Sequence, residues 1–180
     1  MRRVVVAGSQ GSGKTTLALQ LGRALGVSVI HGDVLYYRPG WKPSEVGEFR
    51  ARVSQAIARD GWVLDGSFDG LALDLTIAAA DTFIFIERSR WQCLWRVLWR
   101  SLFDRDPRRP DLPDGCREML DWALLKQTWR YNAVRRPEIE RERAQFGAHV
   151  AVVRLSSDRE IAAFLQGAGV SSSLLPAKRL

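Results

Sequence analysis

Residues 8–15 form a glycine-rich motif of fixed spacing, which restricts the fold more than any other feature of the chain. The motif reads GSQGSGKT and matches the G-x-x-x-x-G-K-[ST] pattern of a phosphate-binding loop. It follows a short apolar run at residues 4–7 and precedes the leucine-rich residues 17–21. In the order strand, glycine loop, helix, backbone N–H groups and a helix N-terminus form a cavity for phosphates. The sequence therefore predicts a nucleotide-binding protein.

The loop residues have distinct expected roles. Lys14 is expected to reach the β- and γ-phosphates, and the Thr15 hydroxyl to hold Mg²⁺. ATP and Mg²⁺ are accordingly the expected cofactors. The loop residues expected to bind the nucleotide are Gly8, Ser9, Gln10, Gly11, Ser12, Gly13, Lys14, Thr15 and Thr16.

Apolar runs alternate with helical patterns along the rest of the chain. After the strand before the loop, strands are expected at residues 27–30, 62–66, 82–87 and 150–155. Helices are expected at 14–25, from a cap at Ser44 to Gly61, at 71–80, 88–103, 116–146 with a break at Pro137, and 158–165. Residues 32–43 are expected to form a loop. This pattern predicts an α/β fold, a three-layer α/β/α arrangement around a five-stranded parallel sheet.

The length of 180 residues suits one domain, expected at 1–168, with a lid-like helical region at about 88–143 and a flexible basic tail at 169–180. The longest apolar stretch, 71–86, is interrupted by Asp74 and Asp81, so no segment is expected to span a membrane. The N-terminus lacks the apolar core of a signal peptide, which predicts a cytoplasmic protein without a membrane partner. Cys93 and Cys116 lack metal-ligand spacing and are expected to be reduced thiols.

The net charge of +7 is concentrated in the second half of the chain. Residues 1–87 hold nine basic and nine acidic side chains, whereas residues 88–143 hold fourteen basic and nine acidic ones. Such an excess suits the phosphates of a small substrate or the backbone of a nucleic acid. Charge alone does not separate these partners.

Three acidic residues are placed at the ends of expected strands, where ligands of a parallel sheet bind. Asp65 is the favoured Mg²⁺ ligand, although Asp-Gly is also a common turn, and Glu87 is its rival. Asp33 is a candidate general base or substrate anchor, with a helix or loop cap as the alternative. His31 is expected to be structural.

Residues 88–103 predict an amphipathic helix with two notable rows of side chains. Arg96 and Arg100 lie one turn apart, so both can approach a transferred phosphoryl group, although a solvated basic face is an equal alternative. Trp91, Trp95 and Trp99 recur every four residues, a stripe more typical of core or subunit packing than of base stacking. A homodimer through this helix is one expectation. Arg105, Arg108 and Arg109, in the proline-rich loop at 104–115, are candidate lid residues, with solvated linker charges as an equal alternative.

Several segments together resemble the small P-loop NTPases known as DNA topology modulation proteins, which have an adenylate-kinase-like fold. Besides the phosphate loop, they are residues 31–33 (HGD), 36–41 (YYRPGW), 62–68 (WVLDGSF) and 93–96 (CLWR). The resemblance covers about residues 1–165. The chain is more distantly similar to adenylate, shikimate and gluconate kinases.

This resemblance implies roles for residues outside the loop. Asp65 matches the acid that helps to position Mg²⁺, and Asp33 matches an acceptor-side acid of shikimate-type kinases. Arg96 and Arg100 match the lid arginines of adenylate kinases, the first against adenine and the second towards the phosphates. Residues 67 and 68 are Ser-Phe where adenylate kinases have Phe-Pro-Arg, so an acceptor-binding arginine is missing; Arg38 or Arg50 is the expected replacement.

The sequence thus favours an ATP- and Mg²⁺-dependent kinase that phosphorylates a small molecule, with Lys14, Asp33, Arg96 and Arg100 as catalytic residues. A nucleotide is one acceptor to consider. The alternative is a nucleic-acid-associated ATP-binding protein or ATPase, as the resemblance to topology modulation proteins and the basic second half suggest.

Overall fold

The computed structural model describes residues 1–103, 112–113, 115–116 and 121–168. The expected tail at 169–180 and most of the loop at 104–115, with Arg105, Arg108 and Arg109, lie outside the described residues. The same holds for residues 117–120, at the start of the expected helix 116–146.

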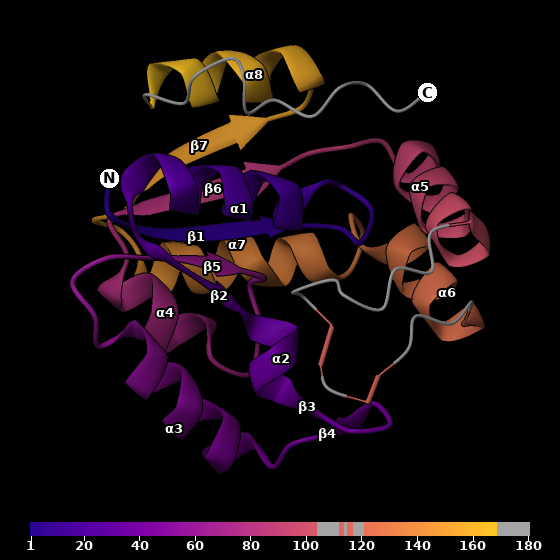
Figure 1. Cartoon of the computed structure of the whole chain (residues 1–180), viewed down its shortest axis with the longest axis horizontal. Helices are drawn as coiled ribbons and strands as arrows, with labels where there is room; N and C mark the ends of the chain where they lie inside the picture. Colours follow the sequence, from indigo (N-terminus) through magenta and orange to yellow (C-terminus); the bar gives the residue numbers. More distant parts are fainter. Residues whose placement is uncertain (104–111, 114, 117–120, 169–180) are drawn as a thin grey trace.

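Five parallel strands form the central sheet in the order β2-β5-β1-β6-β7 (Figure 1). They are β1 (Arg3–Gly8), β2 (Ser28–His31), β5 (Trp62–Asp65), β6 (Thr82–Ile86) and β7 (Ala151–Leu155). The register pairs Val6 with Asp65 on one side of β1 and with Ile84 on the other. These strands are nearly continuous apolar runs because helices cover both faces of the sheet. The predicted α/β fold and five-stranded parallel sheet are therefore confirmed.

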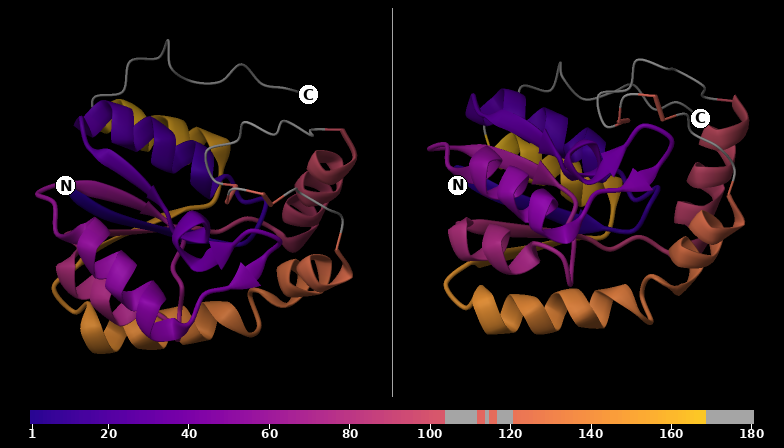
Figure 2. Two further views of the ribbon diagram at one scale, coloured as in Figure 1. Left: turned by 60° about the horizontal axis from the view of Figure 1, so that its bottom comes forward. Right: turned by 90° about the horizontal axis from the view of Figure 1, so that it is seen from below.

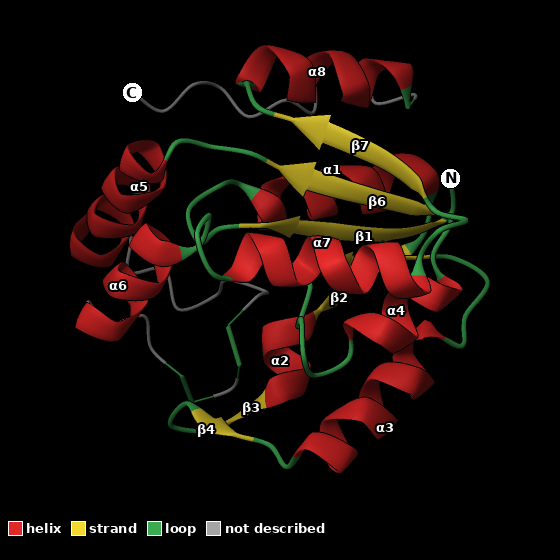
Figure 3. Cartoon of the chain, turned by 180° about the vertical axis from the view of Figure 1, so that it is seen from behind, coloured by secondary structure: helices red, strands yellow, loops and turns green. Residues whose placement is uncertain are grey.

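Each face of the sheet has its own helices (Figures 1 and 3). On one face α1 (Lys14–Leu25) and α8 (Asp158–Gly167) pack over side chains such as Val4 and Val6. On the other, α4 (Leu73–Ala79) and α7 (Arg135–Phe146) pack over Val5 and Phe85. The alternation of Val4, Val5 and Val6 between the faces is the period of two expected of a strand.

Two helices, α5 (Arg90–Phe103) and α6 (Trp122–Arg130), stand side by side beyond the sheet edge at which its strands end (Figures 1 and 2). The helix α3 (Val46–Ile57) packs beside α4. Among the described residues, no helix has the length and apolar character needed to cross a membrane.

The structure corrects four expectations. Residues 32–43, expected as a loop, contain the short helix α2 (Gly32–Tyr36) and the hairpin of β3 (Tyr37–Arg38) and β4 (Lys42–Pro43). The cap of α3 is Glu45, whose carboxylate accepts from the Glu48 N–H at 3.2 Å, and not Ser44.

The other two corrections concern the long helix expected at 116–146. The helix is interrupted at residues 131–134, between α6 and α7. Pro137 lies in the first turn of α7, where a missing N–H removes no helical hydrogen bond. Residues 135–143, expected in the lid-like region, belong to α7, whose Ile139 is fully buried against the sheet.

Candidate functional site

The phosphate loop connects β1 to α1 and depends on glycine conformations. Gly8, Gly11 and Gly13 have φ angles of 155°, 74° and 99°, a region that side chains other than glycine rarely adopt. A Cβ atom at Gly8 would lie 2.8 Å from the Ser12 Oγ and 2.9 Å from the Ile86 carbonyl oxygen. The loop is therefore packed tightly against the end of β6, and its glycines are needed for space as well as for φ.

Polar groups surround the inside of this loop. The Lys14 Nζ donates to the Ser9 carbonyl oxygen at 3.0 Å, so the lysine folds back over the loop. The hydroxyl of Ser12, which is 1% exposed, has no hydrogen-bond partner in the described part of the chain. Moreover, the first N–H groups of α1, those of Lys14, Thr15 and Thr16, have no intrahelical acceptor. An unsatisfied buried hydroxyl, a lysine and free helix donors fit the phosphates of a nucleotide.

The helix α5 packs directly on the phosphate loop. A Cβ atom at Gly11 would lie 2.5 Å from the Cys93 carbonyl oxygen and 3.2 Å from the Val97 Cγ2. Arg96 and Arg100 flank Val97 on the same helix, so the structure brings the arginine pair to the border of the loop. Arg96 is 43% exposed and lies 3.8 Å from the Asp158 carboxylate at the start of α8.

The predicted Mg²⁺ ligands lie on adjacent elements. Asp65 is buried at the end of β5, next to Val6 of β1, and its Oδ2 lies 3.4 Å from the Nδ1 of His31. Thr15 lies in the first turn of α1. Among the described residues, no group of three or more His, Cys, Asp or Glu side chains is arranged to hold a metal. A site of one carboxylate and one hydroxyl still fits Mg²⁺, which takes most of its ligands from phosphates and water in such proteins.

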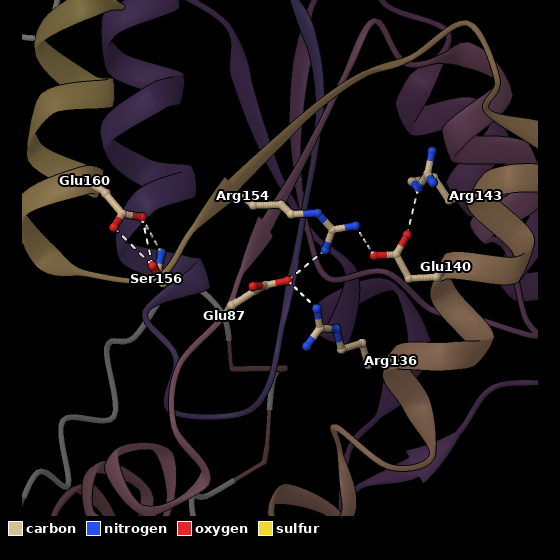
Figure 4. A network of polar contacts seen from close by, with 7 residues as sticks. All are labelled: Glu87, Arg136, Glu140, Arg143, Arg154, Ser156 and Glu160. Carbon is tan, nitrogen blue, oxygen red and sulfur yellow. Dashed lines mark hydrogen bonds and ion pairs between the residues drawn. The ribbon is translucent and has the colours of Figure 1, made fainter.

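Glu87, the rival Mg²⁺ ligand, is held in a different network (Figure 4). Its Oε1 accepts from Arg136 of α7 at 2.6 Å and from Arg154 of β7 at 2.7 Å. Arg154 also forms an ion pair with Glu140, which in turn forms one with Arg143. The network therefore joins the end of β6 to α7 and β7. Because two guanidinium groups neutralise Glu87, Asp65 remains the better metal ligand of the two.

Arg38 and Arg50, the expected replacements for the missing acceptor-binding arginine, both interact with carboxylates. Arg50 donates to both carboxylate oxygens of Asp74 and to the Leu71 carbonyl oxygen, each at 2.8 Å. Arg38 forms an ion pair with Glu48 of α3. Both arginines are thus paired with carboxylates, and their role in place of the missing acceptor-binding arginine remains a prediction.

A recess that the sequence did not reveal lies between α7 and the loop after β5. Its volume is about 530 Å³, and its lining residues are Tyr36, Asp69, Gly70, Leu71, Arg135, Glu138, Arg141 and Glu142. Asp69 is 6% exposed and its Oδ2 lies 3.1 Å from the Arg135 guanidinium. Asp69 and Arg135 are 66 positions apart in the sequence, so only the fold brings them together.

The charges of this region act on one another. Burial raises the pKa of Asp69, and the Arg135 guanidinium partly opposes that increase. Burial also raises the pKa of Tyr37. The Asp33 carboxylate raises this pKa further, whereas the Arg135 guanidinium lowers it. Asp33, which is exposed on α2, and Arg135 thus have opposite effects on the pKa of Tyr37.

Comparisons with known proteins agree with this architecture at the level of the fold. No family model matches the chain, and no curated protein matches it, so membership of the topology modulation family remains a prediction. Among the solved structures that match is shikimate kinase from Acinetobacter baumannii in complex with shikimate. The TM-score is 0.58 at 14% identity, over 93% of this chain and 90% of that chain. The chain thus has a shikimate-kinase-like α/β fold.

Proposed function

We propose that this protein is an ATP- and Mg²⁺-dependent kinase that transfers the γ-phosphoryl group to a hydroxyl group of a polar small molecule. The observation that supports the proposal is the contact between Gly11 and α5, the helix that carries Arg96 and Arg100. Positive charge around the equatorial oxygens is the main requirement of phosphoryl transfer. The kinase-like fold favours this function over a nucleic-acid-associated one.

Each group then has one task. The loop N–H groups and Lys14 bind the phosphates, and Thr15 and Asp65 hold Mg²⁺, which neutralises charge on the β- and γ-phosphates when it is bound. The acceptor oxygen forms a bond to the γ-phosphorus while the bond from that phosphorus to the β,γ-bridging oxygen breaks. Asp33 takes the hydroxyl proton, and ADP leaves. Arg96 and Arg100 stabilise the charge on the transferred group.

The recess is the proposed acceptor site. Its carboxylates from Asp69, Glu138 and Glu142 and its guanidinium groups from Arg135 and Arg141 suit an acceptor with several polar groups. Arg135 supplies a cation on the acceptor side, in place of Arg38 or Arg50. That the matching structure is a shikimate kinase in complex with shikimate supports a small-molecule acceptor.

The test is a search for a phosphorylated product. Purified full-length protein is incubated with Mg-ATP and a panel of hydroxyl-bearing metabolites, nucleosides and nucleotides, and mass spectrometry detects the gain of a phosphoryl group. We expect at least one acceptor to be phosphorylated with equimolar formation of ADP. Failure of every member of the panel, with ATP binding intact, would contradict the proposal.

A matched pair of variants checks that the loop performs the reaction. Lys14→Ala removes the lysine over the loop and is expected to lower kcat by about a hundredfold or more. Lys42→Ala removes an exposed lysine of β4 and should leave the turnover unchanged. Equal turnover of the two variants would place the activity elsewhere or in a contaminant.

A further inference from the structure

Two neighbouring helices expose an unusual number of large apolar side chains on one surface. We define the aromatic face as Trp91, Trp95, Trp99, Leu102 and Phe103 of α5 with Trp122 and Trp129 of α6. Their exposed fractions range from 40% for Trp129 to 85% for Trp122. Large contiguous apolar patches are rare on proteins that have no partner. We therefore expect a binding partner to cover the aromatic face.

Ring contacts occur both between the two helices and along α5. The centroids of Trp91 and Trp129 are 4.9 Å apart in an edge-on contact that joins α5 to α6. Along α5, the ring of Trp99 lies 5.9 Å from that of Trp95 and 4.3 Å from that of Phe103. The buried residues of α5 are on its opposite side, where Cys93 and Val97 contact the phosphate loop. The aromatic face thus lies on the side of α5 that points away from the phosphate loop.

The charged side chains of the two helices are all cationic. The cations are Arg90, Arg96 and Arg100 of α5 with Lys126 and Arg130 of α6, and neither helix contains Asp or Glu. Lys126 lies on the same side of α6 as Trp122 and Trp129, by helical spacing. Arg90 stacks over the Trp129 ring at 4.7 Å. In the sequence, Asp104 directly follows α5 and Asp121 directly precedes α6, where its carboxylate accepts from the Ala123 N–H.

We propose that the aromatic face docks on an anionic lipid surface. Tryptophan prefers the boundary between acyl chains and headgroups, where its ring is apolar and its N–H is solvated. Basic side chains beside such rings bind anionic headgroups, and an amphipathic helix of this composition lies in the plane of the interface. This is attachment to a membrane surface, which no spanning helix is needed to produce.

Two other occupants fit the observations less well. A second copy would place Arg90, Lys126 and Arg130 of one protein near the same cations of the other. Single-stranded nucleic acid needs open ring faces for stacking, whereas Trp99 is packed between Trp95 and Phe103.

The test is sedimentation of the full-length protein with vesicles. Vesicles of phosphatidylcholine and phosphatidylglycerol in equal parts are compared with vesicles of phosphatidylcholine alone, at low and at high salt. We expect binding to the anionic vesicles only, weakened by salt, with a blue shift of tryptophan emission. The variant W95S/W99S should bind at least about tenfold more weakly, and K126E/R130E should lose most of the binding.

Matched controls separate the aromatic face from general effects. Phe146→Ser removes an exposed ring at the end of α7, and R59E/R159E makes the same change of net charge on other elements; both should bind like the wild type. Absence of binding to anionic vesicles would overturn the proposal. A dimer that W95S/W99S dissociates, or an oligonucleotide that binds through this face when vesicles do not, would assign the face to that partner instead. The kinase assay is independent of every one of these outcomes.

Discussion

Replacement of Gly11 by alanine tests whether the phosphate loop and α5 form one rigid unit. In the structure Gly11 has a φ of 74°, and an added Cβ atom would lie 2.5 Å from the backbone carbonyl oxygen of Cys93. A backbone atom of a helix cannot rotate away as a side chain can. The methyl group therefore forces the loop and α5 apart.

The expected loss of stability has two parts. Alanine in the left-handed region costs roughly 1–2 kcal/mol. Separation of two packed elements by one methyl group costs about 1–3 kcal/mol more. Gly26 is the matched control, because its φ is 64° and no atom lies within 4 Å of the added Cβ. Gly26→Ala should thus show the first part alone.

Urea unfolding of the wild type, G11A and G26A measures these free energies. With a slope m of about 2 kcal/mol/M, a loss of about 3 kcal/mol for G11A lowers the midpoint by about 1.5 M. G26A should lower the midpoint by half that amount or less. Equal losses for the two variants would refute the direct packing of α5 on the loop, and with it the placement of Arg96 and Arg100 beside the phosphates.

Three further predictions concern stability and turnover. Burial raises the pKa of Asp69 above its ordinary value of 3.8, so the folded protein binds the carboxyl proton more tightly than the unfolded chain does. Stability therefore falls as the pH rises from 3.8 through the raised pKa of the folded state. Asp69→Asn should therefore be more stable than the wild type at neutral pH and lose that advantage in acid. Urea midpoints of both proteins across the pH range check this, and a difference between the midpoints that does not change with pH would contradict it. Ile139→Ala leaves a cavity at a fully buried position of α7 and should lower the free energy of unfolding by about 2–4 kcal/mol, measured in urea. A loss below about 1 kcal/mol would mean that α7 is not packed on the sheet as described. Arg100→Lys keeps the charge but loses the planar guanidinium, and should lower kcat by about tenfold or more at unchanged affinity for ATP, whereas an unchanged kcat would remove Arg100 from the reaction.

The sequence predicts well the elements that local patterns determine. The strands and the helices of the core follow from apolar runs and glycine stops; α1, for example, spans residues 14–25 as expected and ends at Gly26 in the left-handed conformation. The phosphate loop follows from its own spacing. The short α2 and the two-residue strands β3 and β4 were missed because segments of this length have no period to detect.

The acceptor side was not predictable for a different reason. The contact between Asp69 and Arg135 joins residues on different elements, and no local motif indicates it. Arg50 was a reasonable candidate from its charge, but Asp74, 24 positions later, engages it through two hydrogen bonds. Pairing of charges between elements is decided by packing, so a single sequence does not reveal which arginines remain for a substrate.

The measurement that tests the central claim most directly is the fate of a labelled γ-phosphate. The protein is mixed with γ-labelled Mg-ATP and each compound of the acceptor panel, and the label is divided between phosphorylated acceptor, inorganic phosphate and unreacted ATP. We predict that with the correct acceptor the label appears mainly in the phosphorylated acceptor, and that Lys14→Ala abolishes this transfer. Label that appears only as inorganic phosphate throughout the panel, or that stays in ATP, would contradict the assignment of this protein as a kinase.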